Sequence, residues 1–143
     1  MTEGIAIRGT DGQWTISCPE QHRANAVAKN DATRGRFKDV VRILKNLRTE
    51  MSEKKLLTVD VSSFFIECLI YNVEEGFFAG EPSAHYARVR RILQRIMAQM
   101  VDIGVENALK EVNGINLLFG SQAWTIFTAY SFAERALKYL DEV

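Results

Sequence analysis

Apolar residues recur at helical spacing along most of the chain, and this periodicity limits the possible folds more than any other feature. Between Arg34 and about Met51 they fall at i, i+3, i+4, i+7 and i+10, namely at Phe37, Val40, Val41, Leu44 and Leu47. This spacing is typical of one buried face of an amphipathic α-helix. The sequence therefore predicts a helix over 34–51, with Asp31 or Thr33 as its N-cap.

Three further segments are predicted to be helical. The run "SSFFIECLIYNV", residues 62–73, is apolar nearly all round, which favours a buried central helix capped by Ser62 or Ser63 over a buried strand. A third helix lies within "PSAHYARVRRILQRIMAQMVDIG". It would place Tyr86, Val89, Leu93, Ile96 and Met100 on one side and Arg88, Arg91 and Arg95 on another. The last helix is expected from Ser121 to about Leu140, with Trp124, Phe127, Phe132, Ala133, Leu137 and Leu140 as its apolar residues.

The N-terminal part of the chain has a different pattern. "GIAIR" and "WTIS" are strand-like and are joined across Asp11 and Gly12, which predicts a β-hairpin. Residues 20–36, after Pro19, are polar and rich in small side chains, which predicts a connector with one helical turn around Arg23 to Ala28. The expected fold class is mostly α: a helical bundle of about four main helices with a short N-terminal β-hairpin. The expected domains are the hairpin, 1–20, and the bundle, 21–143.

Composition excludes several classes of protein. The 143 residues suit one domain, and the formal net charge of zero argues against direct nucleic-acid binding. No apolar run reaches the roughly 20 residues of a membrane span, and the N-terminus lacks the pattern of a signal peptide. Cys18 and Cys68 belong to no Cys-x-x-Cys pair, so we expect buried free thiols in a reducing compartment. These features predict a cytoplasmic protein without a membrane partner.

Basic residues are concentrated in one window. Between His22 and Arg48 there are eight basic residues and two acidic ones. On the predicted helix Arg34, Lys38, Arg42 and Lys45 form a stripe beside the apolar face. Arginine and lysine suit a triphosphate, and the N-terminus of the helix that Ser62 and Ser63 begin also favours anions. A solvated helix face and a plain N-cap serine explain the same residues without a ligand.

Three stretches resemble a known family. "PEQHRANAVAKNDATRGRFKDVVRILKNLR", "VSSFFIECLIYNV" and "LLFGSQAWTIFTAYSFAERALKYL" are similar to the C-terminal half of the bacterial cGAS/DncV-like nucleotidyltransferases, the CD-NTases, which are related to oligoadenylate synthetases. Members combine a Pol-β-like catalytic lobe with a helical lobe. They condense nucleoside triphosphates into cyclic or linear oligonucleotide signals in anti-phage defence. The resemblance covers almost the whole chain and implies that this chain is the helical lobe.

The resemblance also implies a triphosphate-binding site. In the family, the lysine of an R-x-x-K helix pattern and the serine that begins the next helix hold the donor triphosphate. Those positions are Lys45, three residues after Arg42, and Ser63, although Ser62 stands where the family usually has proline. Lys38 would line the same cleft. The expected partner is thus a nucleoside triphosphate bound by Lys45, Ser63, Lys38 and Arg42.

The catalytic signature of the family is not found in this sequence. The family has a Gly-Ser motif followed by Asp-x-Asp and a third acidic residue, which bind two Mg²⁺ ions. Here Gly120-Ser121 is followed by an apolar run, no Asp-x-Asp occurs, and Asp60 is wrongly placed. We therefore expect no catalytic residue, metal site or cofactor on this chain alone, with Mg²⁺ required by the parent enzyme. The hairpin would then be the last strands of a missing catalytic lobe.

Three interpretations remain open. The chain is the nucleotide-binding lobe of a longer or split nucleotidyltransferase, a stand-alone module that binds a nucleotide or a protein partner without catalysis, or an antitoxin-like protein whose basic stripe meets an acidic partner. Other residues carry little functional signal. His22 and His85 lack metal-ligand spacing, and Trp14 and Trp124 are better explained by packing than by base stacking.

Overall fold

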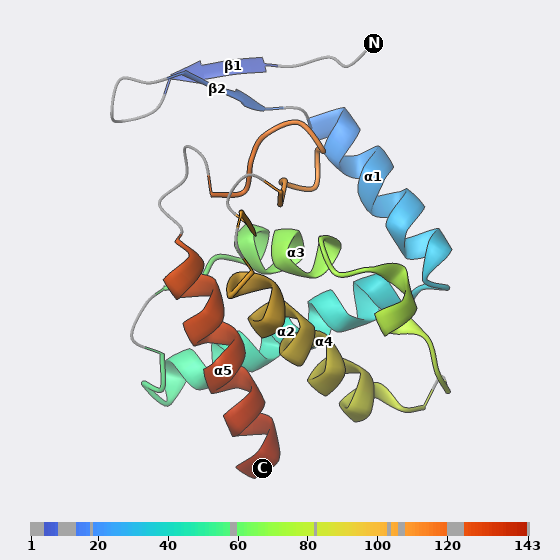
Figure 1. Cartoon of the computed structure of the whole chain (residues 1–143), viewed down its shortest axis with the longest axis vertical. Coiled ribbons are helices and arrows are strands. Elements are labelled where there is room, and N and C mark those ends of the chain that lie inside the picture. The colour runs from blue at the N-terminus through green and yellow to red at the C-terminus, as the bar shows by residue number, and fades with distance from the viewer. Residues whose placement is uncertain are drawn as a thin grey trace.

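Five α-helices, one short 3-10 helix and one pair of strands make up the structure, a computed structural model (Figure 1). It describes residues 19–57, 60–81, 83–102, 104–105, 108–119 and 125–142, and the backbone alone of residues 5–8 and 14–17. In chain order the elements are β1 (Ile5–Arg8), β2 (Trp14–Ser17), α1 (Pro19–Ala32), α2 (Arg36–Glu53), α3 (Ser63–Tyr71), η1 (Glu75–Phe78), α4 (His85–Met100) and α5 (Ile126–Glu142). None of the helices, as far as they are described, is long and apolar enough to cross a membrane.

Strands β1 and β2 pair antiparallel, with Ile5 opposite Ser17 and Arg8 opposite Trp14. The residues between the strands, which include the expected Asp-Gly turn, lie outside the described residues, so the hairpin turn stays a prediction. The expected division of the chain into domains at residue 20 stays a prediction as well.

Helix α1 corrects the sequence analysis, which expected a connector with a single helical turn. The segment is a helix of 14 residues with no buried residue, so it has no apolar face from which periodicity could be detected. Pro19 at the first helical position and Glu20 in the first turn both favour a helix start. Polar contacts attach the helix: the Asn25 side chain donates to the Val112 carbonyl at 2.7 Å, and Lys29 donates to the Val73 carbonyl. The structure therefore has five α-helices where about four were expected.

Helix α2 begins two residues later than predicted. Arg34 and Gly35 have positive φ angles of 56° and 82°, so the helix starts at Arg36. The Thr33 hydroxyl accepts a hydrogen bond from the Phe37 N–H at 3.0 Å, and the Asn30 side chain accepts one from the Lys38 N–H at 3.1 Å. Thr33, one of the two residues expected to cap this helix, therefore provides a capping oxygen, although Gly35 occupies the N-cap position. Arg34 lies outside the helix, so the predicted stripe loses its first member.

Helix α3 begins as predicted, but its surface is not wholly buried. Ser62 is the N-cap, and its hydroxyl accepts from the Phe65 N–H at 3.1 Å. Phe65, Ile66, Cys68, Leu69 and Ile70 are buried, whereas Phe64 is 37% exposed. The helix prediction is confirmed over the strand alternative, and the expectation of burial on all sides is wrong at Phe64.

Helices α4 and α5 lie side by side in Figure 1, and the sequence analysis misjudged single positions in both. Arg88 was assigned to a charged side of α4 but is only 1% exposed, and Tyr86 was assigned to the apolar side but is 51% exposed. Helix α5 begins at Ile126, where the Thr125 hydroxyl accepts from the Thr128 N–H, and the predicted start at Ser121 lies outside the described residues. Phe127 on its first turn is 71% exposed.

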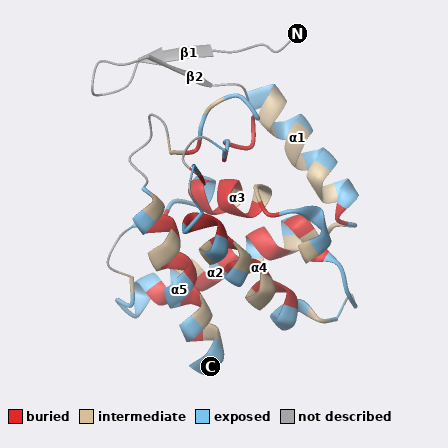
Figure 2. Cartoon of the chain, viewed as in Figure 1, coloured by how far each residue is buried: buried red, intermediate tan, exposed pale blue. Residues whose placement is uncertain are grey.

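The hydrophobic core lies between α2, α3, α4 and α5 (Figure 2), where the buried faces of these helices meet. Its largest apolar side chains are Phe37, Phe65, Phe78, Phe132, Leu44, Met51, Ile66, Leu69, Ile70, Ile92 and Leu93. Burial of apolar surface is the main favourable term in folding, so these four helices form the stable body of the molecule. Helix α1 lies on the outside of this body and keeps both charged and small residues exposed.

Candidate functional site

The N-terminus of α3 lies against the second half of α2. The Arg48 guanidinium on α2 donates one hydrogen bond to the Ser63 hydroxyl at 2.9 Å and another to the Val61 carbonyl just before α3. Since the Ser62 hydroxyl is engaged in capping α3, Ser63 is the serine whose hydroxyl faces α2. The structure thus joins a cation of the basic window to the serine that begins the next helix.

Lys45 lies one helical turn before Arg48 on α2. Residues three apart share a helix face, so Lys45 is on the same side of α2 as Arg48. Its side chain is half-buried, and within the described part of the chain it has no ion-pair partner. The expected meeting of Lys45 with Ser63 stays a prediction, since the contact to Ser63 comes from Arg48.

Lys38 and Arg42 lie nearer to the start of α2. Lys38 is exposed. The Arg42 guanidinium is 3.4 Å from a carboxylate oxygen of Asp39, and its side chain is 70% exposed. Such an exposed i,i+3 pair contributes little and opens easily, so Arg42 is free to exchange Asp39 for a stronger anion.

A cavity of about 430 Å³ opens beside Arg48. Its lining consists of Arg48, Ser52, Leu57, Asp60, Val61 and Ser62. The cavity offers a cation, two hydroxyl groups and one carboxylate, which is a polar surface rather than a metal site. Over the described residues no cluster of three or more His, Cys, Asp or Glu side chains could hold a metal ion.

Two contacts near the start of α3 were missed by the sequence analysis. Arg48 was counted in the basic window but not assigned to the site, although its position three residues after Lys45 could have placed it there. His22 was assigned to a connector, yet its Nε2 atom is 2.6 Å from a carboxylate oxygen of Glu67, and its ring stacks on Phe64 with centroids 5.8 Å apart. His22 therefore links α1 to α3 within about one and a half turns of the Ser62 cap. His85 is exposed at the start of α4.

Cys68 is the buried free thiol that the sequence predicts. It is fully buried in α3, and burial raises the pKa of its thiol to about 12. A thiol that stays protonated at neutral pH is a poor nucleophile and a poor metal ligand. Cys18, Trp124 and the side chain of Trp14 lie outside the described residues.

The sequence matches the model of the C-terminal helical domain of cGAS/DncV-like nucleotidyltransferases over residues 24–141. The chain belongs to this nucleotidyltransferase family. The cGAS/DncV-like match begins within α1 and ends in α5, so all the helices that build the core and the Arg48–Ser63 contact lie inside it.

Characterised cGAS/DncV-like relatives are cyclic nucleotide synthases. The chain is 31% identical over 141 residues to the cyclic dipyrimidine nucleotide synthase CdnE of Legionella pneumophila, covering 97% of this chain and 46% of the relative. It is 34% identical over 142 residues to the cyclic dipurine nucleotide synthase of Elizabethkingia meningoseptica, covering 96% and 46%. The chain thus spans about half the length of these relatives.

Solved structures of cGAS/DncV-like enzymes share the fold. The CdnE cyclic dinucleotide synthase of Elizabethkingia meningoseptica, solved with GTP and Apcpp, superposes with a TM-score of 0.80 at 32% identity, covering 96% of this chain and 49% of that one. The CdnE c-UMP-AMP synthase of Rhodothermus marinus, solved with Apcpp and Upnpp, gives a TM-score of 0.73 at 29% identity, covering 99% and 45%. The match to about half of each enzyme is consistent with a C-terminal lobe.

Proposed function

We propose that this chain is the nucleotide-binding helical lobe of a nucleotidyltransferase that makes cyclic or linear oligonucleotide signals in anti-phage defence. The observation that carries the proposal is the hydrogen bond from Arg48 to Ser63. This hydrogen bond connects the basic side of α2 to the serine at the start of α3, and the chain belongs to a nucleotidyltransferase family. The solved relatives hold triphosphates or their analogues, which supports a nucleotide as the ligand.

The chemistry of the site suits the triphosphate of the donor nucleotide. Lys45 and Ser63 would bind phosphate oxygens, the lysine as a point charge and the serine through its hydroxyl donor. The N-terminus of α3 adds the positive end of its helix dipole. Lys38 and Arg42 extend the positive potential along α2, where they would attract the triphosphate before it settles. The role of this lobe is to position the donor.

Bond formation would depend on groups outside this set. In-line phosphoryl transfer of this kind uses carboxylates that hold two Mg²⁺ ions, which neutralise the charge developing on the triphosphate. We assign those carboxylates to a catalytic lobe that precedes the helical lobe. This chain's residues would then fix the triphosphate at one wall of the cleft between the two lobes.

The test is a titration of the isotope-labelled chain with Apcpp, followed by NMR. We expect weak saturable shifts at Lys45, Arg48 and Ser63, because half of the cleft is provided by the other lobe. The double variant Lys45→Ala/Ser63→Ala should abolish the shifts, whereas Lys138→Ala/Ser83→Ala, two exposed positions on α5 and before α4, should keep them. An unchanged titration curve for Lys45→Ala/Ser63→Ala would reject this site.

A further inference from the structure

Arginine side chains gather around the turn between η1 and α4, at the opposite end of α2 from Ser63. Arg88 donates from Nε to the Phe78 carbonyl at 3.0 Å and from Nη2 to the Glu81 carbonyl at 2.6 Å. Arg36 donates to the Gly80 carbonyl at 2.7 Å, and Arg91 donates to the Ala79 carbonyl at 3.4 Å. The acceptors are thus four consecutive carbonyl oxygens. These contacts explain how the turn is held, but carbonyl groups carry only partial charge, so they do not neutralise the cations.

The deepest of these cations is poorly satisfied. Arg88 is 1% exposed, and its Nη1 atom has no hydrogen-bond partner among the described residues. Burial lowers the pKa of Arg88, the neighbouring charges of Arg36 and Arg91 lower it further, and the charge of Asp39 offsets only part of this effect. Neither these three arginines nor Arg34 takes part in an ion pair within the described part of the chain. A buried charge without a counter-ion is costly, so an anion bound here would relieve that cost.

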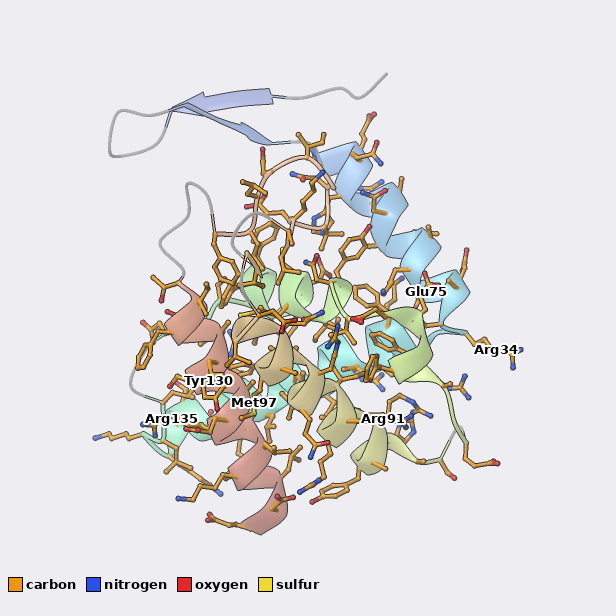
Figure 3. The ribbon with its side chains drawn as sticks, in the orientation of Figure 1. Arg34, Glu75, Arg91, Met97, Tyr130 and Arg135 are labelled. Carbon is orange, nitrogen blue, oxygen red and sulfur yellow. The ribbon has the colours of Figure 1, made fainter. Side chains whose placement is uncertain are left out.

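A cavity of about 320 Å³ lies beside this cluster. Arg34 and Arg36 line it together with Thr33, Glu75, Phe78 and Gly80. A Cβ atom at Gly80 would lie 3.7 Å from Nη2 of Arg91 and 4.0 Å from Nη2 of Arg88, so both guanidinium groups come close to the cavity wall. In Figure 3 the Arg34 side chain extends outward beyond the end of α1, with Glu75 above it and Arg91 lower and further in, on α4. The cavity lining thus contains one carboxylate, that of Glu75, and two guanidinium groups, with those of Arg88 and Arg91 close behind Gly80.

We propose that this cavity binds the phosphate groups of a small anionic molecule. Guanidinium groups match phosphate oxygens through paired N–H donors, and two of them, Arg34 and Arg36, are at the surface of the cavity with donors still available. The site is separate from the proposed donor site, because Arg36 and Arg48 are twelve positions apart on α2, a distance of about 18 Å along the helix. Free phosphate, pyrophosphate and the phosphate tail of a nucleotide share the required chemistry.

The test is an NMR titration of the isotope-labelled chain with inorganic pyrophosphate at constant ionic strength, with sodium chloride as the control salt. Parallel titrations with inorganic phosphate and with Apcpp distinguish the sources of the phosphate group. We expect saturable shifts of the Gly80 amide and of the Arg36 Nε–H signal with at least one of the three. The variant Arg34→Gln/Arg36→Gln should weaken this binding by about tenfold or more. The variant Arg23→Gln/Lys138→Gln, which removes the same charge from two exposed positions, should leave it unchanged.

Two further variants make the result decisive. Arg34→Gln alone leaves the contacts of the turn intact and should still weaken binding, whereas Glu75→Gln removes the facing carboxylate and should strengthen it severalfold. Shifts that fail to saturate with all three anions would overturn the proposal. So would shifts that survive in Arg34→Gln/Arg36→Gln but vanish in Lys45→Ala/Ser63→Ala, since the anion would then occupy the donor site. Lys45→Ala/Ser63→Ala should leave anion binding in this cavity unchanged, so a failure of the donor-site proposal is distinguishable from a failure of this one.

Discussion

The guanidinium of Arg48 on α2 and the hydroxyl of Ser63 on α3 lie 2.9 Å apart, and the same guanidinium also donates to the Val61 carbonyl. One side chain therefore fixes the entry of the chain into α3 and the position of the serine proposed to meet the donor triphosphate. An incoming phosphate would find the cation and the hydroxyl already aligned. Such preorganisation lowers the cost of binding, because fewer groups must be ordered when the ligand arrives.

Replacing Arg48 should affect binding more than folding. Arg48→Ala removes a cation and two hydrogen bonds at the α2–α3 junction, so we expect the affinity for Apcpp to fall by about tenfold and the free energy of unfolding to fall by about 1 kcal/mol. Arg48→Lys keeps the charge but loses the paired donors, so its affinity for Apcpp should lie between those of Arg48→Ala and the parent chain. Titration calorimetry measures the affinity, and urea unfolding measures the free energy of unfolding. Equal affinity in Arg48→Ala and the parent chain would show that Arg48 is only structural.

The two adjacent serines should separate stability from binding. Ser62→Ala removes the N-cap of α3 and should lower the free energy of unfolding by about 1 kcal/mol. Ser63→Ala removes the hydroxyl that faces Arg48 and should weaken Apcpp binding while costing less stability. Each variant is the matched control of the other in urea unfolding and NMR titration. The reverse pattern, with Ser63→Ala the less stable and Ser62→Ala the weaker binder, would contradict the assignment.

Burial of Cys68 should make stability fall in alkaline solution. The pKa of its thiol rises to about 12 in the folded chain, while an unfolded thiol ionises near its ordinary value of 9.0. The folded state therefore holds the proton more tightly, and its advantage is complete below about pH 9 and lost progressively between about pH 9 and pH 12. In a Cys18→Ser background we expect a thiol reagent to modify Cys68 only as fast as the chain opens. Rapid modification of the native chain at pH 8 would contradict the burial.

The sequence predicted the parts of the fold that have apolar periodicity or a recognisable capping residue. The helix that contains Phe37 and Leu44 and the cap at Ser62 follow directly from spacing and residue type. Helix α1 could not be found in this way, because polar contacts such as Asn25 to Val112 attach it from 87 positions away in the chain. Partners so distant in sequence leave no local signal.

The same limit applies to charged residues. Arg88 has the spacing of the exposed charges on its helix, but the carbonyl groups of the η1–α4 turn hold it inside the molecule. Arg48 shares a face of α2 with Lys45, and its contact with Ser63 arises because α3 packs on α2. Periodicity shows which side chains share a helix face, whereas the identity of the group opposite them depends on tertiary structure.

Lys29 should titrate below the ordinary range of a lysine. Its ammonium lies 5.7 Å from the centroid of the Tyr71 ring and 5.4 Å from that of Phe78, and it donates to the Val73 carbonyl near the end of α3. Burial lowers the pKa of Lys29, and the charges of Glu75 and Glu74 offset part of this effect. The folded chain therefore releases this proton before the unfolded chain does, so Lys29 should add stability as pH rises from its lowered pKa toward 10.5. An NMR titration of the lysine side chains should place the midpoint of Lys29 below the ordinary lysine value of 10.5. Glu75→Gln should lower the Lys29 midpoint further, because it removes a neighbouring charge that favours the ammonium. A Lys29 midpoint at or above 10.5 would contradict the enclosed position that fixes α1 to the end of α3.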